Sequence, residues 1–127
     1  IRRTVSMLPE KINFNNKFLK FSDYWSPKII AEMNNYQFKL VKIKGEFVWH
    51  SHKDTDETFI VIEGEMNIKF RNNTVHLSKG EMYVIPKGIE HKPYSENECK
   101  ILIIEPEGVI NTGEKKGKMT ADENIWI

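Results

Sequence analysis

Two histidines and a glutamate, all good ligands for transition metals, lie within the short run His50–Glu57, which reads HSHKDTDE. Residues two apart on a β-strand point to the same face, so His50 and His52 would direct two imidazoles at one point. If Asp54–Asp56 forms a hairpin tip, the returning strand brings Glu57 back within side-chain reach of the histidines. The run therefore predicts two nitrogen donors and one carboxylate around a metal ion.

A metal held by this run needs a further protein ligand, and His91 in PKGIEHKPY is the natural candidate. His76 is less suited, because it stands between Val75 and Leu77 on the polar side of an alternating run. We expect its ring to face solvent or a polar neighbour. The alternative is an exposed polar hairpin whose histidines bind nothing, and a second histidine segment in register weighs against it.

These side chains must be positioned by short strands, because β-branched and aromatic runs separated by turn residues make up most of the chain. The predicted strands are Lys28–Met33, Tyr36–Ile43, Phe59–Ile62, Met66–Phe70, Val75–Leu77, Met82–Ile85 and Cys99–Glu105. One or two helical turns are expected only within Glu10–Phe21. Many short strands with regular turns predict an all-β sandwich or barrel.

Two spaced motifs resemble those of the cupins, which are small metal-binding jelly-roll barrels. The first, Gly45–Gly64, reads G-EFVW-HSH-KDTD-E-TFIVIE-G, with a first gap one residue shorter than usual. The second, Gly80–Ser95, reads G-EMYVI-PKG-IE-H-KPY-S, with Ser95 where the family has asparagine. That asparagine is not a metal ligand, so its loss concerns a turn contact. Gly64, Gly80, Pro86 and Gly88 match the turn formers of the two motifs.

The resemblance implies an all-β cupin jelly-roll barrel that forms one domain over residues 1–127. We expect its core at 28–105, an N-terminal arm at 1–27 and a C-terminal tail at 106–127. It also implies one divalent transition metal ion (Fe, Mn, Zn, Ni or Co) bound by His50, His52, Glu57 and His91. Glu57 is the one residue predicted to have a catalytic role, mainly as a metal ligand. The chain looks like small members of the cupin type 2 group, often named mannose-6-phosphate-isomerase-like.

Composition excludes several other classes of function. Lys and Arg number 19 and Asp and Glu 18, so the formal net charge of +1 gives no strong field toward nucleic acid or a lipid surface. No apolar run is long enough to span a bilayer, and no secretory leader is recognisable. The single cysteine, Cys99, cannot form an internal disulfide. It is expected to be buried and inert, and it suits a cytoplasmic location.

Three functions fit such a site. The first is a metal-dependent enzyme acting on a small molecule, with a dioxygenase ahead of an isomerase or lyase. The second is a binding module that takes up a small carboxylate or sugar without turnover. The third is a closed metal site that only stabilises the barrel. A phosphate-binding isomerase would need a basic cluster inside the barrel, and Lys42 and Lys44 are weak candidates because strand parity changes at Gly45.

The surroundings of the site are expected to be mostly apolar. Residues that share parity with the ligands are Val48, Phe59, Val61, Ile89 and Pro93. Glu46 also shares it, although a glutamate on the rim is the simpler expectation. We find no second acid–base pair in the sequence, so any reaction would draw on the metal. The C-terminal stretch could close the mouth of the barrel, with Trp126 as an apolar plug.

A homodimer is expected from the N-terminal segment. Phe14, Phe18, Phe21, Tyr24 and Trp25 make this segment more apolar than a free tail should be. The edges of jelly-roll sheets also need cover. We therefore predict that the segment packs on, or exchanges strands with, a second copy of the chain.

Overall fold

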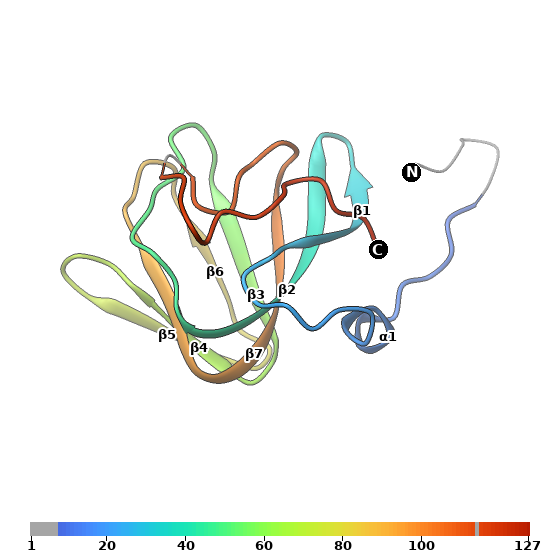
Figure 1. The fold of residues 1–127 in the computed structure, drawn as a ribbon, viewed down its shortest axis with the longest axis horizontal. Helices are drawn as coiled ribbons and strands as arrows, with labels where there is room; N and C mark the ends of the chain where they lie inside the picture. The colour runs from blue at the N-terminus through green and yellow to red at the C-terminus, as the bar shows by residue number, and fades with distance from the viewer. Residues whose placement is uncertain (1–7, 114) are drawn as a thin grey trace.

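The computed structural model describes residues 8–113 and 115–127, and nearly all of its regular structure is β-sheet (Figure 1). Its elements are α1 (Phe14–Phe18), β1 (Lys28–Met33), β2 (Tyr36–Glu46), β3 (Glu57–Glu63), β4 (Glu65–Lys69), β5 (Thr74–Ser78), β6 (Met82–Ile85) and β7 (Lys92–Pro106). The all-β prediction is confirmed, and each predicted strand is present. The one helix among residues 8–113 and 115–127 lies inside the expected stretch. Asn13 caps it by accepting a hydrogen bond from the Asn16 N–H.

All strand pairs are antiparallel, and the long strand β7 joins two parts of the sheet. The main order is β1-β2-β7-β3-β6, and the β4–β5 hairpin attaches to the first part of β7. Figure 1 shows this hairpin projecting to one side of the strands. The second half of β7 pairs with β3. One strand therefore holds elements from both sides of the molecule, and the sheet curves around an interior.

Alternation along the strands divides the core into an inner and an outer cluster. The inner cluster consists of Val41, Ile43, Phe59, Val61, Met66, Ile68, Leu77, Ile85, Cys99, Ile101 and Ile103. The outer cluster contains Phe18 of α1 packed on Ile30, Leu40 and Leu102. Thus the helix covers the outside of the sheet near β1 and β2, and it leaves the interior to the strands.

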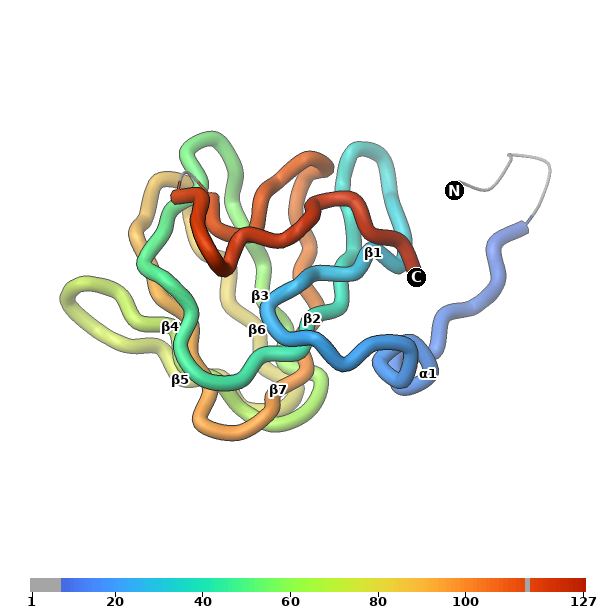
Figure 2. The backbone as a smooth tube through the Cα atoms, viewed as in Figure 1, coloured from blue at the N-terminus to red at the C-terminus, as the bar shows by residue number. Residues whose placement is uncertain are grey.

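The two ends of the chain lie differently. Residues 8–13 lie at the edge of the molecule beyond α1 and line a groove there with β1 and the C-terminus, whereas the C-terminal segment crosses in front of the strands (Figure 2). Trp126 then forms an isolated parallel bridge with Ile29 of β1 and lines a surface groove there. The prediction of Trp126 as a plug in the mouth of the barrel is therefore wrong, because the chain has already passed that mouth before it reaches β1.

Within the described residues, no helix is both long and apolar enough to cross a membrane.

Candidate metal centre

The histidines of the site come from two neighbouring segments that lie side by side. His50 and His91 form an isolated antiparallel bridge, with a backbone hydrogen bond in each direction of 3.0 and 2.9 Å. The Gly88 N–H also donates to the His52 carbonyl at 2.8 Å, at the end of the turn that Pro86 begins. Gly88 has φ +79°, which a side chain would strain.

Glu57 reaches the histidines in a way that differs from the predicted hairpin. It is the first residue of β3, which pairs with β6 and β7 and not with the segment that carries His50 and His52. The hairpin interpretation is therefore wrong, although the convergence it was meant to explain is present. The His50 segment pairs instead with the segment just before β7, which carries His91. This backbone bridge places His91 in the cluster.

Ring orientation is set by backbone carbonyls close in sequence. Nδ1 of His50 lies 2.9 Å from the Val48 carbonyl, and Nδ1 of His91 lies 2.9 Å from the Ile89 carbonyl. A carbonyl can only accept, so Nδ1 carries the proton in both rings and Nε2 presents a lone pair. Orientation of this kind, by a partner on the other ring nitrogen, is the usual support of a metal-binding histidine.

The four donor groups form one buried cluster. His50, His52, Glu57 and His91 are 2%, 6%, 4% and 0% exposed, and one donor atom from each lies within 4.8 Å of the others. Glu57 Oε1 is 3.3 Å from His52 Nε2 and 3.5 Å from His91 Nε2. All three of these atoms are buried without a hydrogen-bond partner. Buried polar atoms are rarely left unpaired, and a metal ion would satisfy all three together. The cluster is a possible metal-binding site whose metal is unidentified.

The charges of His50 and Glu57 match what a metal requires, since imidazole ligands must be neutral and a carboxylate ligand ionised. Burial lowers the pKa of His50 to about 4, helped by the nearby His91. Burial by itself would raise the pKa of Glu57, but the adjacent rings of His52 and His91 outweigh it and hold that pKa below its usual range. The fold therefore favours a neutral His50 and an ionised Glu57 at neutral pH.

A second buried polar pair lies in the interior and was missed by the sequence analysis. Lys39 Nζ is 2.8 Å from Glu105 Oε2, and the two side chains are 1% and 2% exposed. Burial raises the pKa of Glu105 well above its usual range, as does the charge of Glu57, while Lys39 acts in the opposite direction. The sequence showed no second acid–base pair, and this buried ion pair is an addition that the structure makes.

The sequence feature that could have revealed this pair is the alternation of buried residues along β2 and β7. Lys39 alternates with Val41 and Ile43, and Glu105 alternates with Ile103 and Ile101, so one cation and one anion stand on buried faces. Lys42 and Lys44, the lysines weighed as phosphate ligands, lie elsewhere. Lys42 donates to the Phe21 carbonyl on the outer face, and Lys44 is exposed.

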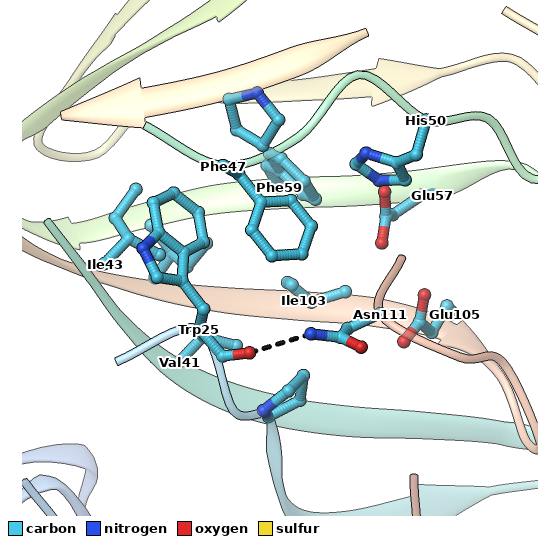
Figure 3. Close-up of a pocket in the computed structure, with 13 residues that line it drawn as sticks. Trp25, Val41, Ile43, Phe47, His50, Glu57, Phe59, Ile103, Glu105 and Asn111 are labelled. Carbon is cyan, nitrogen blue, oxygen red and sulfur yellow. Dashed lines mark hydrogen bonds between the residues drawn. The ribbon is translucent and has the colours of Figure 1, made fainter. Parts of the chain in front are cut away.

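A small cavity adjoins the cluster, as Figure 3 shows. Its lining residues are Trp25, Pro27, Val41, Ile43, Phe47, His50, Glu57, Phe59, Pro93, Ile101, Ile103, Glu105 and Asn111. Its volume is about 30 Å³. One water needs roughly 10–15 Å³ on this measure, so the enclosed space suits a few atoms.

The cavity is mostly apolar, as predicted, but only some of the predicted residues line it. Phe59 and Pro93 line the cavity, and Val61 belongs to the inner core beside it. Val48 and Ile89 instead contribute their carbonyls to the histidine rings, and the Ile89 side chain is 45% exposed. The prediction from strand parity failed for Val48 and Ile89 because their two segments meet at an isolated bridge and do not form a regular strand pair.

Segments from both ends of the chain complete the wall. Trp25 stacks on Phe47 with ring centroids 4.7 Å apart, and the side-chain N–H of Asn111 donates to the Trp25 carbonyl at 2.9 Å. Gly113 packs so closely on the Ser51 carbonyl, next to the His52 ring, that a Cβ atom would overlap it. The C-terminal segment therefore helps to cover the site through Asn111 and Gly113.

The remaining candidate residues have ordinary structural roles. Glu46 is exposed and pairs with Lys92 at 3.0 Å, as expected for a residue on the rim. His76 is half-exposed and lies 2.6 Å from Glu65 Oε1. Ser95 Oγ lies within hydrogen-bonding distance of the Glu65 and Asn97 carbonyls, so a turn contact is present despite the missing asparagine. Cys99 is buried, and burial raises its pKa to about 12, which fits an inert thiol.

Comparison with known proteins agrees with this architecture. A family model described as "Cupin domain" (Cupin_2) matches residues 39–105. The crystal structure of a cupin-2 domain containing protein from Shewanella frigidimarina is 66% identical, with a TM-score of 0.74. The match covers 75% of this chain and 93% of that one. The seven antiparallel strands therefore form a cupin jelly roll.

Two further relatives are similar to this chain. Protein NMB1881 from Neisseria meningitidis is 36% identical, with a TM-score of 0.71, over 76% of this chain and 99% of that one. The "Uncharacterized protein YdbB" from Bacillus subtilis is 42% identical over 67 residues, which are 52% of this chain. The match spans 59% of YdbB, which is less than two thirds of its length.

Proposed function

Because the chain belongs to the cupin family, we propose that it is a divalent-metal-dependent protein that acts on a small molecule beside the ion. The observation that carries this proposal is the cavity that opens next to four buried donor groups. A closed structural site would need no adjoining space. A metal that prefers six ligands would have positions left for a ligand after four protein donors.

The bound metal would supply Lewis-acid polarisation of a ligand oxygen. The protein's own part is orientation and exclusion of water. Val48 and Ile89 fix the tautomers of His50 and His91, while Glu57 provides the single negative charge of the cluster. Trp25 and Phe47 form an apolar wall that limits access of water to the cavity. Three neutral imidazoles and one carboxylate leave about +1 of charge with a divalent ion, which favours an anionic oxygen ligand.

A dioxygenase is the reaction that we propose to test first, because oxygen chemistry needs a metal with open positions in a largely apolar pocket. Fe(II)-loaded protein should consume O2 in the presence of a small chelating enol or thiol. Glu57→Ala should abolish the uptake, while Glu63→Ala, an exposed glutamate on the same strand, should leave it unchanged. An oxygen electrode reads both, and absence of uptake across a broad substrate panel would contradict the dioxygenase.

The alternative is a binding module that holds a small carboxylate or sugar without turnover. The buried Lys39–Glu105 pair favours this reading, because it adds a polar group suited to ligand recognition. Metal-loaded protein that binds such ligands without any product would support it. A sugar-phosphate isomerase has less support, since both lysines weighed for its phosphate lie outside the cavity.

We also propose that the protein is a homodimer and that it works in the cytoplasm. The N-terminal segment exposes Leu8, Ile12 and Leu19 at 92%, 39% and 84%, and it lies beside a groove next to the edge strand β1. These side chains suit burial against a second copy. Light scattering at micromolar concentration should give twice the monomer mass, and a monomer would contradict the dimer.

The buried, unpaired Cys99 supports the proposed cytoplasmic location.

A further inference from the structure

Glu105 carries a buried oxygen that receives no hydrogen bond from a donor in the described residues, and its neighbour Glu57 is a second carboxyl group. Lys39 Nζ binds Oε2 at 2.8 Å, whereas Oε1 is buried and has no hydrogen-bond partner. The side chain is only 2% exposed, so bulk water does not compensate this atom. Leaving such an acceptor unpaired costs free energy, and its position therefore points to a donor that arrives from outside the chain.

The side chain of Glu105 lines the same cavity as Glu57 and His50, and Figure 3 shows its carboxyl group below that of Glu57. It lies outside the set of four clustered donors, so it is not one of the candidate ligands. Lys39 fixes its direction from behind. A molecule bound at the metal would thus meet a pre-oriented acceptor on one side.

The other polar side chain of the cavity wall is already occupied. Asn111 donates to the Trp25 and Met119 carbonyls and accepts from the Ala121 N–H. The remaining lining outside the metal cluster consists of aliphatic and aromatic side chains and proline. Among the described lining residues, Glu105 is therefore the acceptor that can still recognise a ligand.

We propose that Glu105, held by Lys39, is the specificity residue of the site and accepts a hydrogen bond from a hydroxyl group of the ligand. The inference rests on the proposed function, and it names the ligand class as small hydroxylated carboxylates. The carboxylate of such a molecule neutralises the metal cluster, its hydroxyl group satisfies Glu105 Oε1, and its few carbons fit the apolar wall.

The test compares two probes that differ by one hydroxyl group, glycolate and acetate, by titration calorimetry on Ni²⁺-loaded protein. The key variant is Lys39→Met/Glu105→Leu, which removes the acceptor and leaves no unpaired charge in the core. Lys39→Met/Glu105→Gln keeps a neutral acceptor at the same place. The matched control, Lys79→Met/Glu63→Leu, makes the same change in an exposed pair whose atoms are 3.5 Å apart. Nickel content is measured for every protein.

Wild type should prefer glycolate, and the Met/Leu variant should lose about tenfold of that preference, as for removal of one hydrogen bond to a charged group. The Met/Gln variant should fall between them, and the control should match wild type. Nickel content should stay equal throughout, because none of these residues belongs to the cluster.

An unchanged preference in a nickel-loaded Met/Leu variant would overturn the inference and leave the proposed function standing. A nickel-loaded wild type that binds neither probe would contradict the proposed function, and the inference would fall with it. If the Met/Leu variant does not fold, the test relies on the Met/Gln variant and on the single variant Glu105→Gln. A full preference for glycolate over acetate in both would remove any role for the carboxylate charge.

Discussion

The interior of this barrel has two ends that differ in chemistry although the same strands build both. At the apolar end, β2 contributes Val41 and Ile43, β3 contributes Phe59 and Val61, and β7 contributes Ile101 and Ile103. At the polar end, the continuing alternation of these strands places Gln37 and Lys39 on β2, Glu57 on β3 and Glu105 on β7. His50, His52 and His91 join the polar end.

The two ends differ most in whether their buried polar atoms have hydrogen-bond partners within the chain. The described residues contain five buried side-chain atoms without a hydrogen-bond partner, and all five belong to the polar end: Gln37 Oε1, His52 Nε2, Glu57 Oε1, His91 Nε2 and Glu105 Oε1. The apolar end is packed with side chains that need no partner. The apolar end is therefore suited to stabilising the fold, whereas the polar end holds the donor groups of the candidate metal site and of the proposed ligand site.

The largest expected effect comes from removing a cluster member. His91→Ala should lower the metal content of the protein from about one ion per chain to near zero after dialysis. The ring is fully buried, and the remaining donors would form an incomplete site. Elemental analysis of chelator-free preparations measures this. The thermal midpoint should fall as well, because metal binding stabilises only the folded state.

The apolar end provides the control for that variant. Ile101→Val should lower the free energy of unfolding by about 0.5–1.5 kcal/mol, as expected for one lost buried methylene group. The loss should be the same with and without metal. If His91→Ala retains full metal content, or if Ile101→Val alters it, the division between the two ends is wrong.

The buried pair should produce the next largest effect. Lys39→Ala leaves the Glu105 carboxylate without its partner and should lower the free energy of unfolding by about 3–5 kcal/mol. Lys39→Met/Glu105→Leu should recover most of the loss, since it replaces the pair by apolar groups. Urea denaturation of metal-free proteins gives both values. Equal destabilisation of the two variants would show that packing, and not the unpaired charge, explains the loss.

The pH dependence of the metal-free protein gives a third prediction. Burial lowers the pKa of His50 from 6.5 to about 4. The unfolded chain therefore takes up a proton at this ring before the native state does, and stability falls as the pH drops from about 6.5 to 4. The free energy of unfolding should fall by roughly 3 kcal/mol in all from the protonation of this ring. His50→Gln should show a correspondingly shallower loss in urea denaturation, and an identical pH dependence would contradict the assignment.

The smallest effect concerns Cys99 at the apolar end. Its thiol is buried, and burial raises its pKa to about 12, so the thiolate that reacts is scarce at pH 8. Iodoacetamide should leave the native protein unmodified over an hour and should modify it fully in urea. Mass spectrometry measures the added mass. Rapid modification without denaturant would show that this end is less closely packed than described.

Most of the strand arrangement could be predicted from the sequence because strand signals are local. Alternating apolar residues and turn residues such as Asn34 and Gly88 located every strand. The four donors were identified because two motifs with fixed spacing repeat a known pattern. What failed was the local geometry at His50. A single backbone bridge to His91 replaces the expected hairpin, and no periodic signal marks such an isolated contact.

Contacts between distant segments could not be predicted in the same way. Lys39 and Glu105 are 66 positions apart, and only the register of β2 against β7 brings them together. Parity could have identified each as a charge on a buried face, but not its partner. Trp25 and Asn111 reach the cavity from irregular ends of the chain. Irregular segments carry no period from which their direction could be inferred.

The most direct test of the account is an anomalous difference map from crystals of protein purified without chelators. The account predicts one transition-metal peak per chain at the polar end, with His50, His52, Glu57 and His91 as ligands at about 2.0–2.2 Å. Further density on the ion toward Glu105 would match the open side of the cavity. The absence of a peak at this cluster in metal-supplemented crystals, or a peak bound by other residues, would contradict the central claim.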